Sequence, residues 1–345
     1  MIDVHHHMFP PVLLAALEAS RLTRVGGEPV TTSWTPEQSL SFMGRHAIES
    51  AVLSVPTPLP TYDFAARVNL AREINEYGRA TAARWPSRFG FFATLPLPDV
   101  TAAVGEARRA LDGLNASGVA LLTNHEGVYQ GDSRLDPLYA ELNAREAVCF
   151  VHPAVPWEDG GPLDSPLPTV QASVLEFPFD TTRAITNVLV SGVLSRFPRI
   201  KFLFTHAGGC VSSLAGRMID RRPLVAAYAA AHGDVPTSRL ESMLAEAQHA
   251  AARQLATLHF DVALSSDEQA LTALTQLIPP TQLLLGTDYP IGQEIGAHVT
   301  LTGIARFAGF TSDDRAAVEG LTAARLLPTL AEAGESAGAS AAEAS

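Results

Sequence analysis

The chain has 345 residues, 47% of them hydrophobic, and a formal net charge of −12. Nucleic acids and anionic membrane surfaces bind basic faces, so this charge argues against either as a partner. Two cysteines, Cys149 and Cys210, do not make a disulfide framework, which favours a cytoplasmic location. No stretch reads as a membrane span or a signal peptide, so no membrane association is expected.

Short β-branched and aromatic runs alternate with longer amphipathic stretches, the pattern of repeated β-α units. Eight strands are expected, at Ile2–His5, Ala51–Val55, Phe89–Leu95, Gly118–Leu122, Val148–His152, Lys201–His206, His259–Ala263 and Leu283–Thr287. Helical patterns between them include Ala65–Arg84, Val100–Leu114, Pro137–Arg145, Thr181–Phe197, Ser238–Thr257 and Glu268–Leu277. This α/β alternation predicts a closed (β/α)8 TIM barrel, with its active site at the carboxyl ends of the strands. A doubly wound open sheet is the alternative.

The barrel is expected to form a single catalytic domain over residues 1–330. Two irregular segments rich in Gly or Pro, at about 21–34 and 153–178, are predicted to be loop excursions at the barrel mouth. Residues 331–345 are almost entirely Ala, Glu, Gly and Ser, a composition that predicts a disordered tail.

A histidine pair closes the first expected strand. Alternate side chains of a strand share a face, so His5 and His7 point the same way and His6 points the other way. Two imidazoles that converge from one stiff strand are suited to bind a divalent metal ion. Taken alone, this motif also fits a cluster of hydrogen-bonded polar side chains without a metal. The metal interpretation therefore requires further ligands from other strand ends.

Three other strands end in metal-binding side chains. His152 ends the fifth strand, His206 ends the sixth, and Asp288 follows the eighth. In a barrel these side chains meet at one mouth, so we predict that His5, His7, His152 and Asp288 hold one divalent ion with an open position. Three nitrogens and one oxygen suit zinc, with manganese as the alternative.

His206 is predicted to act as a general acid or base outside this ligand set. A site with two ions, in which His206 also binds metal, is the alternative. The fourth strand ends in Leu122-Thr123-Asn124 and offers no bridging carboxylate there, so a single ion is favoured.

Other polar side chains have weaker assignments. Asp261 is a candidate acceptor for a ligand imidazole, and His125 lies at a strand end where it could touch substrate. Arg183 is a candidate for binding a carboxylate or, alternatively, for pairing with Asp180. The candidate apolar walls of the pocket are Phe9, Trp157 and Phe177.

The strand ends belong to five motifs: Asp3-Val4-His5-His6-His7, Phe89-Gly90-Phe91-Phe92-Ala93-Thr94-Leu95-Pro96, Val151-His152-Pro153, Thr205-His206-Ala207-Gly208-Gly209 and Gly286-Thr287-Asp288-Tyr289-Pro290. Together they resemble the amidohydrolase superfamily, in its branch of metal-dependent non-oxidative decarboxylases. That branch includes aminocarboxymuconate-semialdehyde decarboxylase and 6-methylsalicylate decarboxylase. The likeness is closest to the 6-methylsalicylate group, through Gly26-Gly27-Glu28-Pro29, Trp34-Thr35-Pro36-Glu37 and Phe179-Asp180-Thr181-Thr182-Arg183-Ala184.

The resemblance implies a metal-dependent hydrolase type of barrel, with the same four metal ligands and His206 as the catalytic histidine. It also implies a homodimer. One departure concerns the substrate: the arginine that grips the substrate carboxylate in the semialdehyde enzymes has no counterpart in Gly27-Glu28-Pro29-Val30. A semialdehyde substrate is therefore not expected.

Three functions follow from these residues. The leading one is decarboxylation of a small aromatic carboxylate with an ortho hydroxyl, with Asp288 or His206 as the acid that protonates the ring carbon. The first alternative is hydrolysis of an amide, ester or lactone by a metal-bound hydroxide, which needs the same ligands. The second is a barrel that only binds a ligand, which the intact set of ligands and the intact histidine disfavour.

Overall fold

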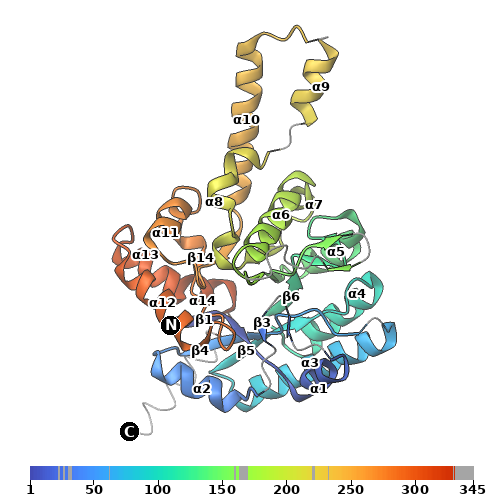
Figure 1. Ribbon diagram of the computed structural model, residues 1–345, viewed down its shortest axis with the longest axis vertical. Coiled ribbons are helices and arrows are strands. Elements are labelled where there is room, and N and C mark those ends of the chain that lie inside the picture. The colour runs from blue at the N-terminus through green and yellow to red at the C-terminus, as the bar shows by residue number, and fades with distance from the viewer. Residues whose placement is uncertain are drawn as a thin grey trace.

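Eight parallel strands form the central sheet, in the order β1-β4-β5-β6-β9-β12-β13-β14 (Figure 1). They are β1 (Ile2–His7), β4 (Ser50–Ser54), β5 (Phe89–Thr94), β6 (Gly118–Leu122), β9 (Val148–His152), β12 (Lys201–Phe204), β13 (His259–Asp261) and β14 (Leu283–Leu284). The computed structural model describes residues 1–21, 24–25, 28–29, 33–61, 63–158, 161–162, 170–219, 222–231, 233–328 and 330. The Val4 amide donates to the Leu285 carbonyl at 3.0 Å and the Asp288 amide to the His5 carbonyl at 2.8 Å, which joins the last strand to the first. The sheet is therefore a closed (β/α)8 barrel, as predicted.

Helices surround this barrel (Figure 1). They are α1 (Pro11–Ala19), α2 (Pro36–Arg45), α3 (Phe64–Arg84), α4 (Val100–Arg108), α5 (Asp136–Ala144), α6 (Glu176–Val190), α7 (Val193–Arg196), α8 (Val211–Leu214), α9 (Arg222–Ala230), α10 (Thr237–Leu255), α11 (Glu268–Thr275), α12 (Gln293–Arg306), α13 (Ser312–Ala316) and α14 (Thr322–Leu326). Among the described residues, no helix has the length and apolar character needed to cross a bilayer.

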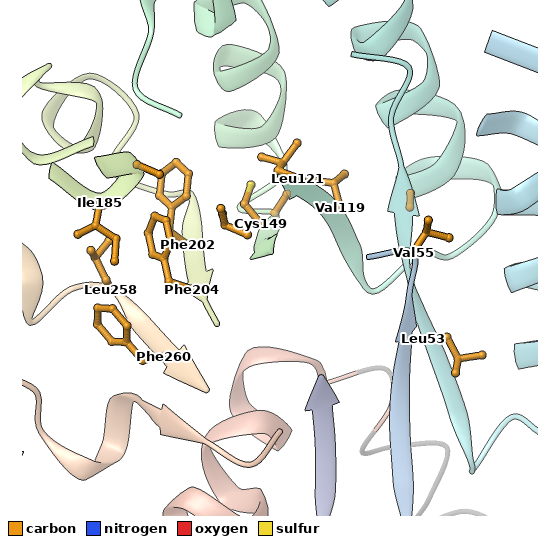
Figure 2. Close-up of a cluster of buried hydrophobic side chains, with 14 of the residues drawn as sticks. Leu53, Val55, Val119, Leu121, Cys149, Ile185, Phe202, Phe204, Leu258 and Phe260 are labelled. Carbon is orange, nitrogen blue, oxygen red and sulfur yellow. The ribbon is translucent and has the colours of Figure 1, made fainter. Parts of the chain in front are cut away.

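The strands bury apolar side chains on both faces, as in other parallel sheets with helices outside. A large cluster fills the space between the sheet and the helices; Figure 2 shows part of it, with Phe202, Phe204 and Phe260 near Ile185 of α6. A smaller cluster contains Val148 and Phe150 of β9. Because alternate residues of a strand share a face, this pattern places His152 on the same face as Phe150.

The second predicted excursion ends earlier than expected. Helix α6 begins at Glu176, so the last residues of the predicted 153–178 segment are helical. Pro178 suggested a loop, because proline disrupts the interior of a helix. In the first turn it is tolerated, because a backbone N–H there would have no partner within the helix. The predicted helix Thr181–Phe197 is in fact two helices, which separate at Gly192, where φ is +76°. The segment also holds a short antiparallel hairpin, β10 (Trp157–Glu158) with β11 (Gly161–Pro162).

The first predicted excursion contains a second short hairpin, of β2 (Arg24–Val25) and β3 (Glu28–Pro29). The rest of its tip, residues 22–23, 26–27 and 30–32, lies outside the described residues. The predicted disordered tail at 331–345 also lies outside them.

Helices α9 and α10 project away from the barrel as an arm (Figure 1). Only the barrel end of α10 is buried, at Ala251 and Leu255. Toward its outer part the arm exposes large apolar side chains: Val225 is 65% exposed, Tyr228 52% and Leu244 37%. The sequence pattern predicted a helix at Ser238–Thr257 but not its projection from the barrel.

Candidate metal centre

Strand β1 presents its histidines as the alternation predicts. His5 and His7 lie side by side in the barrel interior, with their Nε2 atoms 3.0 Å apart. His6 lies on the other face, where its ring packs near Phe42 and Tyr289. The stiff strand thus fixes two imidazoles toward one point.

The other two predicted ligands reach the same point. One potential ligand atom from each of His5, His7, His152 and Asp288 lies within 4.8 Å of the other three, and all four residues are buried. Asp288 Oδ1 is 2.9 Å from His7 Nε2 and 3.3 Å from His5 Nε2. Imidazole nitrogens and a carboxylate oxygen at this spacing match the donor set of a divalent transition metal.

The outer nitrogens of these imidazoles have partners that orient the rings. His152 Nδ1 lies 2.9 Å from the Pro153 carbonyl, which only accepts, so Nδ1 carries the hydrogen and Nε2 keeps its lone pair. His5 Nδ1 lies 3.0 Å from Asp261 Oδ2, the contact predicted from sequence, and His7 Nδ1 lies 3.0 Å from Ser54 Oγ. Such outer partners fix the tautomer that a metal-binding imidazole needs.

The protonation states also fit a cation. Burial lowers the pKa of His7 to about 4 and holds the pKa of His152 well below 6.5, so both rings are neutral near pH 7. Burial disfavours protonation of His5, but Asp261 and Asp288 outweigh it and raise its pKa to about 10. The pKa of Asp288 is held well below its ordinary value, because His5 outweighs the effect of burial. Two carboxylates thus favour positive charge at His5, and a divalent ion at the centre would supply that charge.

His206 lies two residues after the end of β12 and borders this group. Its ring centroid lies 4.9 Å from that of His5. Its Nδ1 lies 3.0 Å from the Ala263 carbonyl, so Nδ1 carries the hydrogen and only Nε2 is left for proton transfer. His206, His5 and Asp261 form a second group of potential ligand atoms. Asp261, however, already accepts from the amides of His206 and Ala263, and this use of the carboxylate favours a single ion.

The backbone at both predicted catalytic residues is left-handed. φ is +52° at His206 and +59° at Asp288, values that side chains other than glycine rarely adopt. Asp3 stabilises the backbone beside Asp288, because its carboxylate accepts from the Thr287 amide at 3.0 Å and from the Thr287 hydroxyl at 2.6 Å. It also accepts from the His5 amide at 3.1 Å. Asp3 therefore positions two of the four candidate ligands through their backbone.

The hydrogen bonds continue from Asp3 toward the first excursion. His6 Nδ1 lies 2.9 Å from Asp3 Oδ2, and His6 Nε2 lies 2.8 Å from Ser39 Oγ. The Trp34 indole donates to that same hydroxyl at 2.9 Å. His6 is thus satisfied on both nitrogens, as predicted for a residue on the opposite face.

Two of the predicted substrate contacts, His125 and Trp157, line a cavity of about 500 Å³ at the barrel mouth. The Phe177 ring centroid lies 6.5 Å from that of His152, beside the metal centre. Phe9 is buried in the hydrophobic core and is not among the residues that line the cavity. An aromatic residue after a strand suits either place, so the sequence alone does not distinguish them.

Arg183 pairs with an acidic residue of its own helix. Its side chain is 51% exposed, and its guanidinium is 3.5 Å from Asp180 Oδ1, the pairing considered as an alternative. Asp180 itself is buried and accepts from the Tyr129 hydroxyl at 2.5 Å and from Asn124 Nδ2 at 3.0 Å. This network ties α6 to the end of β6. Arg183 is not among the residues that line the cavity.

Residues 2–329 match the family model for amidohydrolases. The chain belongs to the amidohydrolase family. This amidohydrolase is 32% identical over 330 residues to a 6-methylsalicylic acid decarboxylase of Aspergillus aculeatus, a match covering 93% of this chain and 92% of the relative. It is 33% identical over 297 residues to a 6-methylsalicylic acid decarboxylase of Penicillium expansum, covering 84% of each chain.

Solved structures share the fold. A crystal structure described as amidohydrolase II is 27% identical, with a TM-score of 0.82 over 95% of this amidohydrolase and 99% of that chain. A dihydroxybenzoic acid decarboxylase of Polaromonas sp. JS666, crystallised with manganese and 2-nitroresorcinol, is 18% identical, with a TM-score of 0.74 over 95% and 96% of the two chains. These likenesses show that this chain shares its fold with both proteins, and the His/Asp group is the part of it suited to hold a divalent metal.

Proposed function

We propose that this protein is a metal-dependent non-oxidative decarboxylase of an ortho-hydroxy aromatic carboxylic acid resembling 6-methylsalicylate. The observation that carries the proposal is the convergence of His5, His7, His152 and Asp288 within 4.8 Å. It occurs in a chain that aligns over 93% of its length with a 6-methylsalicylic acid decarboxylase. The ligand set alone suits hydrolysis equally well, and the relatives favour decarboxylation.

The four side chains would hold one divalent cation, whose charge would bind and polarise the carboxylate and neighbouring phenolate oxygens of the acid. Three nitrogens and one oxygen favour zinc, and the manganese in the Polaromonas enzyme supports manganese as the alternative. Elemental analysis of protein purified without chelators, followed by reconstitution with each ion, distinguishes the two.

Decarboxylation exchanges a carboxylate for a proton at a ring carbon. The bond to the carboxylate breaks, its electron pair stays on the ring carbon, carbon dioxide leaves and the carbon takes up a proton. We assign this proton to His206 or Asp288. His206 has only Nε2 left for the transfer, because Nδ1 is bonded to the Ala263 carbonyl. Asp288 directs Oδ1 at His5 and His7, which leaves Oδ2 for the transfer.

The two donors are separable by substitution. If His206 delivers the proton, His206→Asn keeps the metal and loses activity by about two to four orders of magnitude, the usual effect of removing a positioned acid. If Asp288 delivers it, His206→Asn retains most of the wild-type rate. Metal content measured on the same samples shows that either result concerns the chemistry and not the ligand set.

The aromatic ring of the substrate would lie between the metal centre and the cavity at the mouth. We propose that it contacts Phe177, beside the metal centre, and His125 and Trp157, which line the cavity. We propose no such contact for Arg183, because its guanidinium lies half exposed beside Asp180.

The test is carbon dioxide release from a panel of ortho-hydroxybenzoates that includes 6-methylsalicylate. We expect release by protein loaded with zinc or manganese and none by His5→Ala, which loses a ligand. Absence of release by a fully loaded enzyme across the panel contradicts the proposal, and amides and lactones then become the substrates to assay.

We also propose a homodimer and a cytoplasmic location. The arm supports the first, since Val225, Tyr228 and Leu244 expose apolar surface of the kind that interfaces cover. The free thiols of Cys149 and Cys210 suit a reducing compartment. Light scattering of the purified protein tests the proposed homodimer.

A further inference from the structure

The cavity of about 500 Å³ lies next to the metal centre. Two of its lining residues adjoin residues that hold or border the candidate ligands. Val55 comes directly after Ser54, the partner of His7, and Leu122 pairs with His152 across the sheet. Successive residues of a strand lie about 3.3 Å apart and neighbouring strands about 4.8 Å apart, so these lining residues adjoin the metal centre. A substituent on an aromatic ring bound at the centre would therefore point toward the cavity.

Two threonines that line this cavity have hydroxyls without a hydrogen-bond partner among the described residues. Thr57 and Thr94 are each 7% exposed, and Oγ1 of each is buried. A buried hydroxyl without a partner destabilises the folded protein. Rotation about χ1 exchanges the methyl and hydroxyl positions of threonine, so a ligand in the cavity is able to draw each hydroxyl toward itself. A polar group there would restore the missing hydrogen bonds.

The cavity suits a neutral group. The guanidinium of Arg67, the cation among the lining residues, donates to Glu126 Oε1 at 2.6 Å, so its charge is already matched. His125 Nε2 accepts from the Leu122 amide at 3.1 Å, so Nδ1 carries the hydrogen and is the remaining donor of the ring. Burial and the nearby Arg67 lower the pKa of His125 to about 3, which keeps the imidazole neutral.

We propose that this cavity receives a ring substituent of the aromatic acid, and that Thr57 and Thr94 select a substituent with a neutral hydrogen-bonding group, such as a hydroxyl, over an alkyl group. This selection rests on the proposed function for the position of the ring. An alkyl group leaves both threonine hydroxyls unpaired, whereas a hydroxyl pairs with them in either direction. A volume of about 500 Å³ is within the range of small-molecule pockets and admits such substituents.

The first test compares matched acids that differ only in methyl or hydroxyl at one ring position. 6-Methylsalicylate and 2,6-dihydroxybenzoate form one such pair, and the panel repeats the comparison at the other free positions. For at least one position, we expect each of Thr57→Val and Thr94→Val to lower the ratio of kcat/KM for the hydroxyl acid over the methyl acid by about fivefold, the effect of one lost hydrogen bond. An unchanged ratio at every position in the double variant overturns the proposal.

Thr181→Val is the matched control. Thr181 also has a buried hydroxyl without a described partner, but it is not among the residues that line the cavity. We expect this substitution to leave the ratio unchanged. All three variants replace an unpaired hydroxyl by a methyl group of similar shape, so each is expected to keep or raise the Tm.

A binding assay separates this proposal from the proposed function. Resorcinol and 3-methylphenol carry the same substituent difference without a carboxylate, and calorimetry measures their binding without any turnover. If no acid is decarboxylated but the double variant loses the preference for resorcinol, the function fails and the cavity assignment stands. If decarboxylation proceeds and the double variant keeps the wild-type preference in both assays, the function stands and the cavity assignment fails.

Discussion

Asp261 determines which nitrogen of His5 faces the metal centre. Its Oδ2 accepts from His5 Nδ1, and its Oδ1 accepts from the amides of His206 and Ala263. In Asp261→Asn the amide oxygen is able to keep the two backbone contacts, which turns the NH₂ group toward His5. His5 Nδ1 must then accept, and its hydrogen moves to Nε2, where it blocks the lone pair. We expect metal affinity to fall by about 10- to 100-fold, as for other partners of ligand imidazoles.

Competition with a chromophoric chelator measures this affinity. The Tm of the metal-free variant serves as the control, since a general loss of structure lowers the Tm and the affinity together. Wild-type affinity in Asp261→Asn contradicts the role assigned to this carboxylate.

His259 makes the fold sensitive to acid. Burial and the nearby Lys201 lower the pKa of His259 to about 4, whereas histidine in an unfolded chain titrates near 6.5. The stability that the neutral ring contributes is therefore complete above pH 6.5 and is lost as the pH falls toward 4. In His259→Gln we expect the free energy of unfolding to depend less steeply on pH in this window, by up to about 1.4 kcal/mol per pH unit.

Urea unfolding of the metal-free protein at intervals between pH 7 and pH 4 checks the slope. His249→Gln, at an exposed position on α10, is the control. Equal slopes for His259→Gln and the wild type would show that this ring does not take up the proton.

At the residue scale the sequence predicted the candidate ligands but not their supports. His5, His7, His152 and Asp288 were predictable because each directly follows or ends an apolar run. Ser54 gave no such signal, because a serine within a strand is common and its contact with His7 depends on the register between β1 and β4. The proposed roles of Thr57 and Thr94 depend on hydroxyls that have no hydrogen-bond partner among the described residues, and a sequence pattern does not contain this information.

At the element scale, β14 and β13 approach β1 closely enough to require glycine at one position. A Cβ at Gly286 would lie 2.7 Å from His5 Cβ and 3.0 Å from the Asp261 carboxylate. Gly286→Ala must therefore displace His5 or Asp261. We expect the Tm to fall, with an overpacking cost of about 1–3 kcal/mol, and metal affinity to fall with it.

Gly105→Ala is the matched control for this substitution. Gly105 lies in α4, and a Cβ there meets nothing within 4 Å. Replacing a helical glycine with alanine usually stabilises by about 0.5–1 kcal/mol, so this variant should show a higher Tm and unchanged metal affinity. Thermal unfolding and chelator competition on both variants make the comparison.

The order and type of the barrel strands were predictable from alternating apolar runs, and so were the bounds of β6 and β9, but other boundaries were not. Strand β14 spans only Leu283–Leu284, although the apolar pattern predicted Leu283–Thr287. The rest of the predicted strand instead leads into the left-handed turn at Asp288. The Asp3 carboxylate supports that turn by accepting a hydrogen bond from the Thr287 amide. Such bends depend on contacts between residues far apart in the sequence, which a local pattern does not contain.

At the scale of the whole molecule, the arm is the feature that a monomer does not explain. Its helices, which project away from the barrel (Figure 1), expose Val225, Tyr228 and Leu244. If the arm forms the proposed homodimer interface, Val225→Asp combined with Leu244→Asp should shift the protein to monomer, because charges replace apolar contacts. Multi-angle light scattering measures the mass in solution.

Ile295→Asp provides the comparison. Ile295 is 67% exposed on α12, away from the arm, so its substitution changes the surface charge in the same way without touching the arm. A dimer that persists in the arm variant places the interface elsewhere, and a monomeric wild type removes the proposal.

The metal centre draws its side chains from both ends of the sequence. His5 and His7 lie on the first strand, and Asp288 follows the last. A growing chain on the ribosome therefore holds two or three of the four candidate ligands until residue 288 has emerged. If these four side chains hold the ion, we expect it to be loaded late in biosynthesis, when β14 closes the barrel against β1. Because such a site exists only in the closed barrel, ion binding would stabilise the completed barrel relative to every partly folded form.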